Sequence, residues 1–280
     1  MRRAVAADAA ECGRICYEAF HEIAARHNFP PDVPDIERAR GLMTALFTHP
    51  KFYCVVAESN GRIIGSNCLD ERSPVAGIGP ITVDPAAQDR GAGRALMNAV
   101  MERSRAQRHP GVRLVQAGYH RRSLSLYAKL GFVVREPLAV MTGTPLRRQL
   151  PDCKVRSAAE PDVNACAELH LHVHGFDRTE ELRDGIRHGT ATVVERAGRI
   201  TGFATGIAFF SCAVAESNYD LQALIAAAHS FGGPGFIIPM RNAELFRWCL
   251  AHFKVVEPLT LMTVGLYNEP QGAYLPSILY

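Results

Sequence analysis

Two similar stretches limit the possible folds of this chain more than any other feature. Residues 133–143, VVREPLAVMTG, match residues 254–265, KVVEPLTLMTVG, and their Glu-Pro-Leu triplets are 121 residues apart. Two earlier matches follow the same order: VAE and GRI at 56–63 match VVE and GRI at 193–200, and Asp8 with Cys12 matches Asp162 with Cys166. Matches that keep their order along a chain predict one fold present twice.

The offset between the copies falls from 154 to 137 to 121 residues, so the second copy is shorter in two places. We place the boundary in the polar, proline-containing stretch 144–152. The predicted domains are residues 1–146 and 154–280.

Residues 81–100, ITVDPAAQDRGAGRALMNAV, read as a strand end, an Asp84-Pro85 turn, a glycine loop and a helix. Unpaired N–H groups at a helix start bind anions, and Gly91 and Gly93 let a phosphate approach them. The loop lacks both the Lys-Ser/Thr pair of a nucleoside-triphosphate loop and the spacing G-x-G-x-x-G. It is predicted to bind a different diphosphate; the alternative is a tight turn with no ligand.

A second motif lies in residues 120–132, HRRSLSLYAKLGF. It follows an apolar strand over 112–118 and predicts a short helix that Gly131 ends. The spacing Gln-x-x-Gly-x-Gly in the loop resembles the acyl-CoA pyrophosphate loop of the GNAT superfamily of N-acetyltransferases. The helix resembles that family's second signature, in which a tyrosine follows the first residue by seven positions and the helix ends in Leu-Gly-Phe. Tyr127 matches, and His120 stands where the family usually has Asn.

The resemblance implies an α/β (α+β) fold with two tandem GNAT-like domains, each a mixed, mostly antiparallel central sheet flanked by helices. It implies acetyl-CoA as co-substrate and an amine of a small molecule or peptide as acceptor. The amine attacks the thioester directly, a strand N–H stabilises the oxyanion, and Tyr127 is the catalytic acid that protonates the thiolate. The residues expected to contact acetyl-CoA are Ile81, Thr82, Val83, Gln88, Asp89, Arg90, Gly91, Ala92, Gly93, Arg94, His120, Ser123 and Tyr127.

The general base stays open in the sequence. No glutamate lies on the predicted strand 76–83, where the family often has one, so the candidates are Asp70, Glu71, His120, the C-terminal carboxylate of Tyr280 or a water chain. The tail 267–280 has no counterpart in the first copy and is largely apolar at its end. It is predicted to dock, either bringing its carboxylate to the first site or acting only as a structural clasp.

The second copy is predicted to be catalytically silent. Residues 213–228 contain no glycine, so no phosphate loop is present there, and Trp248 stands in the position of Tyr127. Two alternatives to N-acetylation remain: a non-catalytic CoA-binding sensor or interaction module, and acylation of a hydroxyl or with a longer acyl group. Oligomeric state is not readable from the sequence.

Composition limits the remaining classes. A net charge of +3 without long basic runs argues against nucleic acid, and no segment has the ~18 apolar residues of a membrane-spanning helix. A cytoplasmic location is expected, with all eight cysteines as thiols. No metal site is expected, since only His170 and His174 share a helix face without a third ligand.

Overall fold

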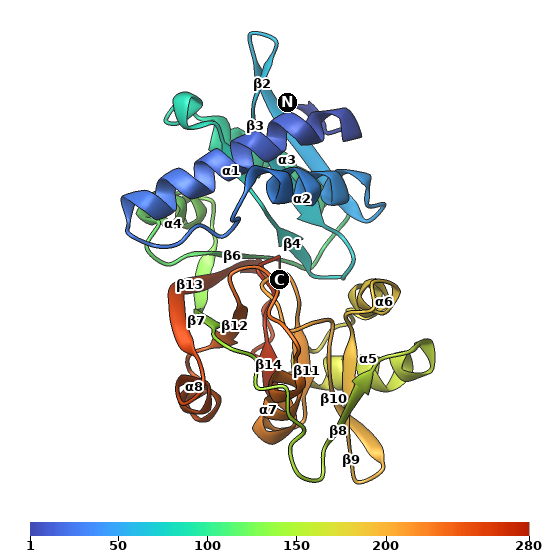
Figure 1. Ribbon diagram of the computed structural model, residues 1–280. Coiled ribbons are helices and arrows are strands. Elements are labelled where there is room, and N and C mark those ends of the chain that lie inside the picture. Colours follow the sequence, from blue (N-terminus) through green and yellow to red (C-terminus); the bar gives the residue numbers. More distant parts are fainter. Residues whose placement is uncertain (280) are drawn as a thin grey trace.

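The computed structural model describes residues 1–279 and shows two similar halves joined by long strands (Figure 1). The first half contains β1 (Arg2–Arg3), α1 (Ala9–Arg26), α2 (Ile36–Thr48), β2 (Phe52–Ser59), β3 (Arg62–Asp70), β4 (Ala76–Ile78), β5 (Thr82–Val83), α3 (Ala92–Ala106), β6 (Gly111–Ala117), α4 (Arg121–Lys129) and β7 (Val133–Thr142). The second half contains β8 (Lys154–Ser157), α5 (Val163–His174), α6 (Thr179–Arg187), β9 (Thr192–Arg196), β10 (Arg199–Ala204), β11 (Ala213–Ala215), α7 (Asn218–Ala227), β12 (Phe236–Pro239), α8 (Ala243–Leu250), β13 (Lys254–Gly265) and β14 (Ala273–Leu275).

The internal repeat is confirmed by matching contacts at the start of each half. Arg2 donates to both carboxylate oxygens of Asp8 at 2.7 and 2.8 Å, and Arg156 donates to Asp162 at the same two distances. Each aspartate also accepts a hydrogen bond from the backbone N–H three residues earlier. The two copies therefore share the same residues at these positions and also the same side-chain hydrogen bonds.

The halves exchange their last strands. The nine-stranded sheet runs β1-β2-β3-β4-β6-β13-β7-β12, with the ninth strand, β5, paired to β3 off this path, so β13 from the second half lies between β6 and β7 of the first. β13 pairs with β6 from Leu259–Ala117 to Gly265–Gly111, while β7 pairs with β12 of the second half. The exchange lies at the waist of the molecule in Figure 1. The domain boundary at 144–152 stays a prediction. The nine-stranded sheet contains strands from both sides of this boundary.

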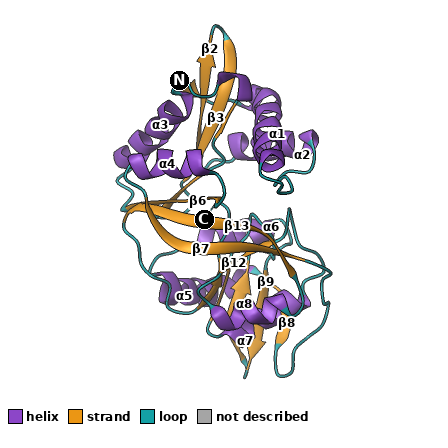
Figure 2. Ribbon diagram, turned by 90° about the vertical axis from the view of Figure 1, so that its left-hand side faces the viewer, coloured by secondary structure: helices purple, strands orange, loops and turns teal. Residues whose placement is uncertain are grey.

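Helices cover both faces of the first-half sheet. α1 and α2 lie on one side of β2 and β3, and α3 and α4 lie on the other (Figure 2). α1 buries Cys12, Ile15 and Cys16, and α3 buries a stripe that includes Leu96 and Val100. Each large apolar side chain so buried contributes about 1.5–3 kcal/mol, which fixes both helix layers on the sheet.

The sheet of the first half opens at Gly79 and Pro80. β4 pairs with β3 on one side and with β6 in parallel on the other, whereas β5 pairs with β3 alone. Proline has no N–H to donate to a ladder, so the strand predicted over 76–83 is interrupted there. The interruption separates β5 from β6.

The second half has no such opening. The tail strand β14 pairs antiparallel with β11 and also contacts β12, which fills the equivalent place. α7 begins two residues after β11 ends, with Ser217 accepting a hydrogen bond from the Asp220 N–H as its cap. A serine side chain thus caps α7, whereas Gly91 occupies the cap position of α3.

The expectation that every cysteine is a thiol is wrong. Cys54 and Cys68 form a disulfide, because the β2–β3 register places them directly opposite each other with 4.1 Å between their Cα atoms. The other six cysteines are free and buried. No helix within residues 1–279 is long and apolar enough to cross a membrane.

Candidate active site

A cavity of about 410 Å³ occupies the opening between β5 and β6. Of the residues predicted to contact the co-substrate, all but Arg90 line it: Ile81, Thr82, Val83, Gln88, Asp89, Gly91, Ala92, Gly93, Arg94, His120, Ser123 and Tyr127. The second half also contributes to the wall, through Phe209, Phe210, Leu259, Ile278 and Leu279. One cavity therefore collects both sequence motifs and side chains from both halves.

The glycine loop has the geometry of an anion cradle. Gly91 caps α3 with a φ of +86°, a left-handed conformation that L-residues adopt at a cost. The first helical hydrogen bond runs from Ala95 N–H to the Gly91 carbonyl, so the N–H groups of residues 92–94 precede the helical ladder. These groups and the positive end of the α3 dipole face the cavity side, where a phosphate would be stabilised.

Side chains hold the loop in place. The Gln88 amide donates to the Val83 carbonyl at 3.3 Å, and Arg122 donates to the Gln88 side-chain oxygen at 3.3 Å and pairs with Asp89. Arg122 also lines the cavity, and it was missed in the sequence because its place in the second motif gives no sign of contact with the loop.

Ile81, just before β5, and Val83 of β5 direct their N–H groups away from β3. Asp84 N–H donates to the Ile64 carbonyl on β3, and alternate residues of an antiparallel strand point their N–H groups to the same side. Thr82 therefore faces β3, and Ile81 and Val83 face the side where β6 has separated. Of the three residues expected to supply the N–H that stabilises the oxyanion, Ile81 and Val83 have N–H groups that point toward the opening.

Tyr127, Ser123 and His120 lie on one face of α4, at spacings of four and three residues. The Ser123 hydroxyl is 2.7 Å from Nδ1 of His120. Burial raises the pKa of Tyr127 to about 12, against the opposite effect of its hydrogen bond with Ser123. Burial and the nearby Arg122 lower the pKa of His120 to about 4, so the imidazole is neutral near pH 7. The three groups form a proton path that ends at a tyrosine still protonated at neutral pH.

Two candidate bases are excluded by their positions. Asp70 pairs with Arg72 at 2.6 Å and Glu71 pairs with Arg103 at 2.9 Å, and neither carboxylate lines the cavity. Both residues lie at the end of β3 that turns away from the opening, so their nearness in sequence to the site was misleading. His120 remains on the wall, and Tyr280 lies outside the described residues.

The sequence did not reveal an acidic pair at the cavity. Asp32, in the loop between α1 and α2, lines the wall, and Glu257 of β13 lies behind it with 1% of its surface exposed. Tyr119 also lines the wall, and burial and the nearby Glu257 carboxylate raise the pKa of its phenol. The only available signal was the repeated Glu-Pro-Leu triplet, and only the strand exchange brings its second glutamate to the first site.

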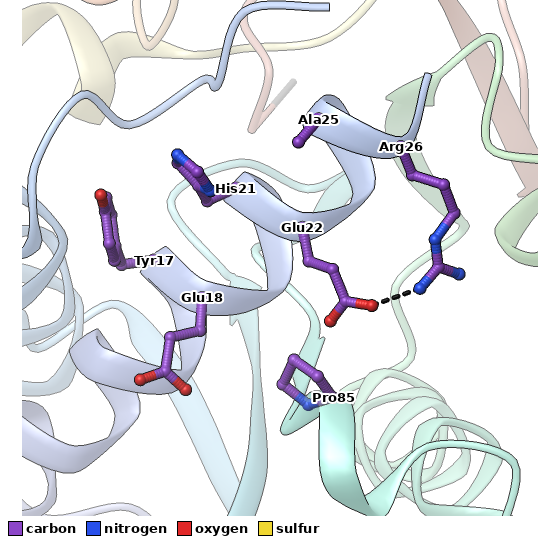
Figure 3. Close-up of a pocket in the computed structure, with 7 residues that line it drawn as sticks. All are labelled: Tyr17, Glu18, His21, Glu22, Ala25, Arg26 and Pro85. Atoms are coloured by element: carbon purple, nitrogen blue, oxygen red, sulfur yellow. Dashed lines mark hydrogen bonds and ion pairs between the residues drawn. The ribbon is translucent and has the colours of Figure 1, made fainter. Parts of the chain in front are cut away.

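A second hollow, of about 660 Å³, lies on the outer side of α1 beside Pro85 (Figure 3). Its floor carries Tyr17, Glu18 and His21, and an ion pair joins Glu22 to Arg26. Glu22 and Arg26 also line the main cavity, so the hollow adjoins its rim. It contains neither the glycine loop nor Tyr127, so we assign the candidate site to the main cavity.

Comparison with known proteins agrees with this arrangement. Residues 17–132 match the model of the acetyltransferase (GNAT) family, a range that contains the glycine loop and Tyr127. No curated protein has a sequence that matches the chain significantly.

Solved structures match nearly the whole chain. A protein from Pyrococcus horikoshii assigned as an acetyltransferase has a TM-score of 0.73 at 21% identity, covering 96% of this chain and 90% of its own. A GCN5-related N-acetyltransferase from Sphaerobacter thermophilus has a TM-score of 0.63 at 16% identity, covering 96% of each chain. A tandem GNAT protein from the clavulanic acid biosynthesis pathway has a TM-score of 0.55 at 15% identity, covering 94% and 97%.

The chain thus has a tandem GNAT-like fold, as its sequence motifs indicated. The first half is the part of the chain that matches the acetyltransferase (GNAT) family model.

Proposed function

We propose that this protein is an acetyl-CoA-dependent N-acetyltransferase that acetylates an amine in the cavity of its first half. The observation that supports the proposal is that three features border the same cavity. They are an anion cradle, two N–H groups directed away from β3, and a buried, protonated tyrosine. A sensor that only binds CoA would need the cradle but not the tyrosine.

Each group has a separate task. Acetyl-CoA supplies the acetyl group as a thioester, and the N–H groups of residues 92–94 with Arg94 bind its diphosphate. The amine nitrogen attacks the carbonyl carbon, and the N–H of Ile81 or Val83 donates to the oxygen as negative charge develops there. As the C–S bond breaks, Tyr127 gives its proton to the sulfur, and Ser123 and His120 restore it.

The test is thiol release from acetyl-CoA by the purified protein against a panel of amines. Tyr127→Phe is expected to lower turnover by roughly 10²–10⁴-fold with little change in acetyl-CoA affinity, because only proton donation is lost. Tyr219→Phe is the matched control, since this tyrosine is exposed on the second half. Near wild-type turnover in Tyr127→Phe would reduce Tyr127 to a packing residue. CoA binding without thiol release for any amine would favour the sensor.

A further inference from the structure

The acidic pair at the cavity is the strongest feature that the proposed function does not use. Asp32 lines the wall, and its Oδ1 is buried. Both carboxyl oxygens of Glu257 are buried as well. Within residues 1–279, neither Oδ1 of Asp32 nor either carboxyl oxygen of Glu257 has a hydrogen-bond partner, and no lysine, arginine or histidine forms an ion pair with either group. A buried acidic pair without a cation is costly unless a ligand supplies one.

The repeat provides an internal comparison. Glu136 is the counterpart of Glu257 and is also fully buried, but it accepts hydrogen bonds from Arg241 at 2.7 Å and from the Tyr274 phenol at 3.0 Å. The silent half therefore neutralises its glutamate with an arginine of its own. The half with the cavity has no such arginine and places an aspartate there instead.

Much of the remaining wall is apolar. The apolar side chains come from α1, the loop before α2, α2 and the second half: Phe20, Ile23, Val33, Leu42, Phe209, Phe210 and Ile278. The other acidic side chains on the wall, Glu22 and Asp89, form ion pairs with Arg26 and Arg122. A single acidic group without an ion pair, beside apolar side chains, matches a ligand with one positive charge and a hydrocarbon body. It does not match a polyamine or an extended peptide, which would leave further polar groups without partners.

We propose that Asp32, supported by Glu257 and Tyr119, is the acceptor site and binds the ammonium group of a small primary amine with an apolar body. This inference rests on the proposed function for the reaction, but its binding claim stands separately. Tyr119 donates to Glu257, Glu257 donates a proton it holds to Asp32, and the ionised Asp32 accepts from the ammonium.

Two electrostatic effects support this order. Burial and the adjacent Asp32 carboxylate raise the pKa of Glu257 to about 9, so Glu257 holds a proton at neutral pH. Burial also raises the pKa of Asp32, which makes its carboxylate a better proton acceptor.

Asp32 is then the base of the reaction. The ammonium transfers one proton to the Asp32 carboxylate, and the neutral amine forms the C–N bond with the acetyl carbon. As the C–S bond breaks, the sulfur takes the Tyr127 proton, and the second proton that the nitrogen loses returns to Tyr127 through His120 and Ser123. The products are the amide and the free thiol, and solvent removes the one remaining proton from Asp32.

Binding can be tested apart from turnover. Calorimetry on the CoA-saturated protein would use 2-phenylethylamine, its neutral analogue 2-phenylethanol, and spermidine. Wild type is expected to bind the amine more tightly than the alcohol by roughly 10–100-fold, the usual value of a charge-assisted hydrogen bond. Asp32→Asn should remove this preference. Glu257→Gln should retain most of it, since a glutamine amide also donates to Asp32.

Glu136→Gln is the matched control and should leave the preference unchanged. The same variants in the thiol-release assay should raise the KM of the amine but not that of acetyl-CoA. Unchanged amine preference in Asp32→Asn, a Glu257→Gln effect as large as that of Asp32→Asn, or tighter binding of spermidine would each overturn the inference. Charge-selective binding that depends on Asp32 but occurs without turnover would support the acceptor site and contradict the proposed reaction.

Discussion

Replacing Gly91 by glutamate tests whether the glycine loop binds the CoA diphosphate. Gly91 has a φ of +86°, and a Cβ at this position would meet no atom within 4 Å. The substitution therefore adds backbone strain of about 1–2 kcal/mol but no steric overlap within the protein. A loss of this size lowers the unfolding temperature by only a few degrees in a chain this long.

The effect on binding should be much larger. A carboxylate about 5 Å from a phosphate charge, at an effective dielectric constant of about 20, costs roughly 3 kcal/mol, which corresponds to about 10²-fold in affinity. Calorimetry with acetyl-CoA should give one site per chain for wild type, because only the first half has the loop. The Gly91→Glu protein should bind at least about 100-fold more weakly.

Two controls separate charge from strain. Gly61 lies in the β2–β3 turn with a φ of +74°, and a Cβ there would likewise meet no atom within 4 Å, so Gly61→Glu carries the same strain and charge away from the cavity. Gly91→Gln adds the same volume without charge and should weaken binding less. The reasoning fails if Gly91→Glu binds as well as Gly61→Glu, or if wild type shows two equivalent sites.

Two shorter predictions concern the tail and an ion pair. Deleting residues 277–280 should lower the unfolding temperature by several degrees and raise the KM of the amine. The reason is that Leu279 is 7% exposed in the core, and its loss alone costs about 2–5 kcal/mol of folding free energy. A large fall in turnover at an unchanged unfolding temperature would instead support a catalytic terminal carboxylate. Hydrogen bonding from Arg156 lowers the pKa of Asp162, so this pair stabilises the fold fully above the unfolded pKa of about 4 and the stabilisation is lost as the pH falls below it. Denaturant unfolding should show Asp162→Asn less stable than wild type at pH 7, with a difference that shrinks toward pH 3; a constant difference would contradict the assignment.

Local sequence signals predicted the parts of the site that one segment builds. The loop at Gly91 and the helix at Tyr127 each depend on backbone geometry that neighbouring residues determine, and both were recognisable. These signals are local, so none of them shows which residues lie on the neighbouring strands of the sheet.

The features that were missed all depend on such long-range placement. Cys54 and Cys68 meet because of a strand register that a bulge near the turn shifts. Glu257 reaches Asp32 only because β13 enters the other half, and these residues are separated by most of the chain. Asp70 and Glu71 were misjudged for the same reason, since nearness in sequence to the opening did not show that Arg72 and Arg103 hold them elsewhere.

The strand exchange also predicts how the first half behaves alone. β7 and β13 are copies of one sequence, and each follows its helix, α4 or α8, after three residues. A chain of residues 1–146 would lose β13 and leave the edge of β6 unpaired, which is an aggregation risk unless a strand replaces it. The β7 strand of a second molecule has the sequence to do so, since its Glu136-Pro137-Leu138 matches the triplet that lies beside β6 in the full chain.

We therefore expect residues 1–146 to form a twofold dimer that exchanges β7 between its copies. A dimer keeps a β7–β7 pairing in place of β7–β13, and so buries strand surface that a monomer would expose. It would also remove Arg241 and Tyr274 from Glu136, which frees this glutamate to approach Asp32 of the other copy as Glu257 does in the full chain. Light scattering should give a dimer, and calorimetry should give two acetyl-CoA sites per dimer against one per full-length chain. A folded monomer would show that β7 can close the first sheet without exchange, and a dimer without acetyl-CoA binding would show that the second half supplies more than a strand.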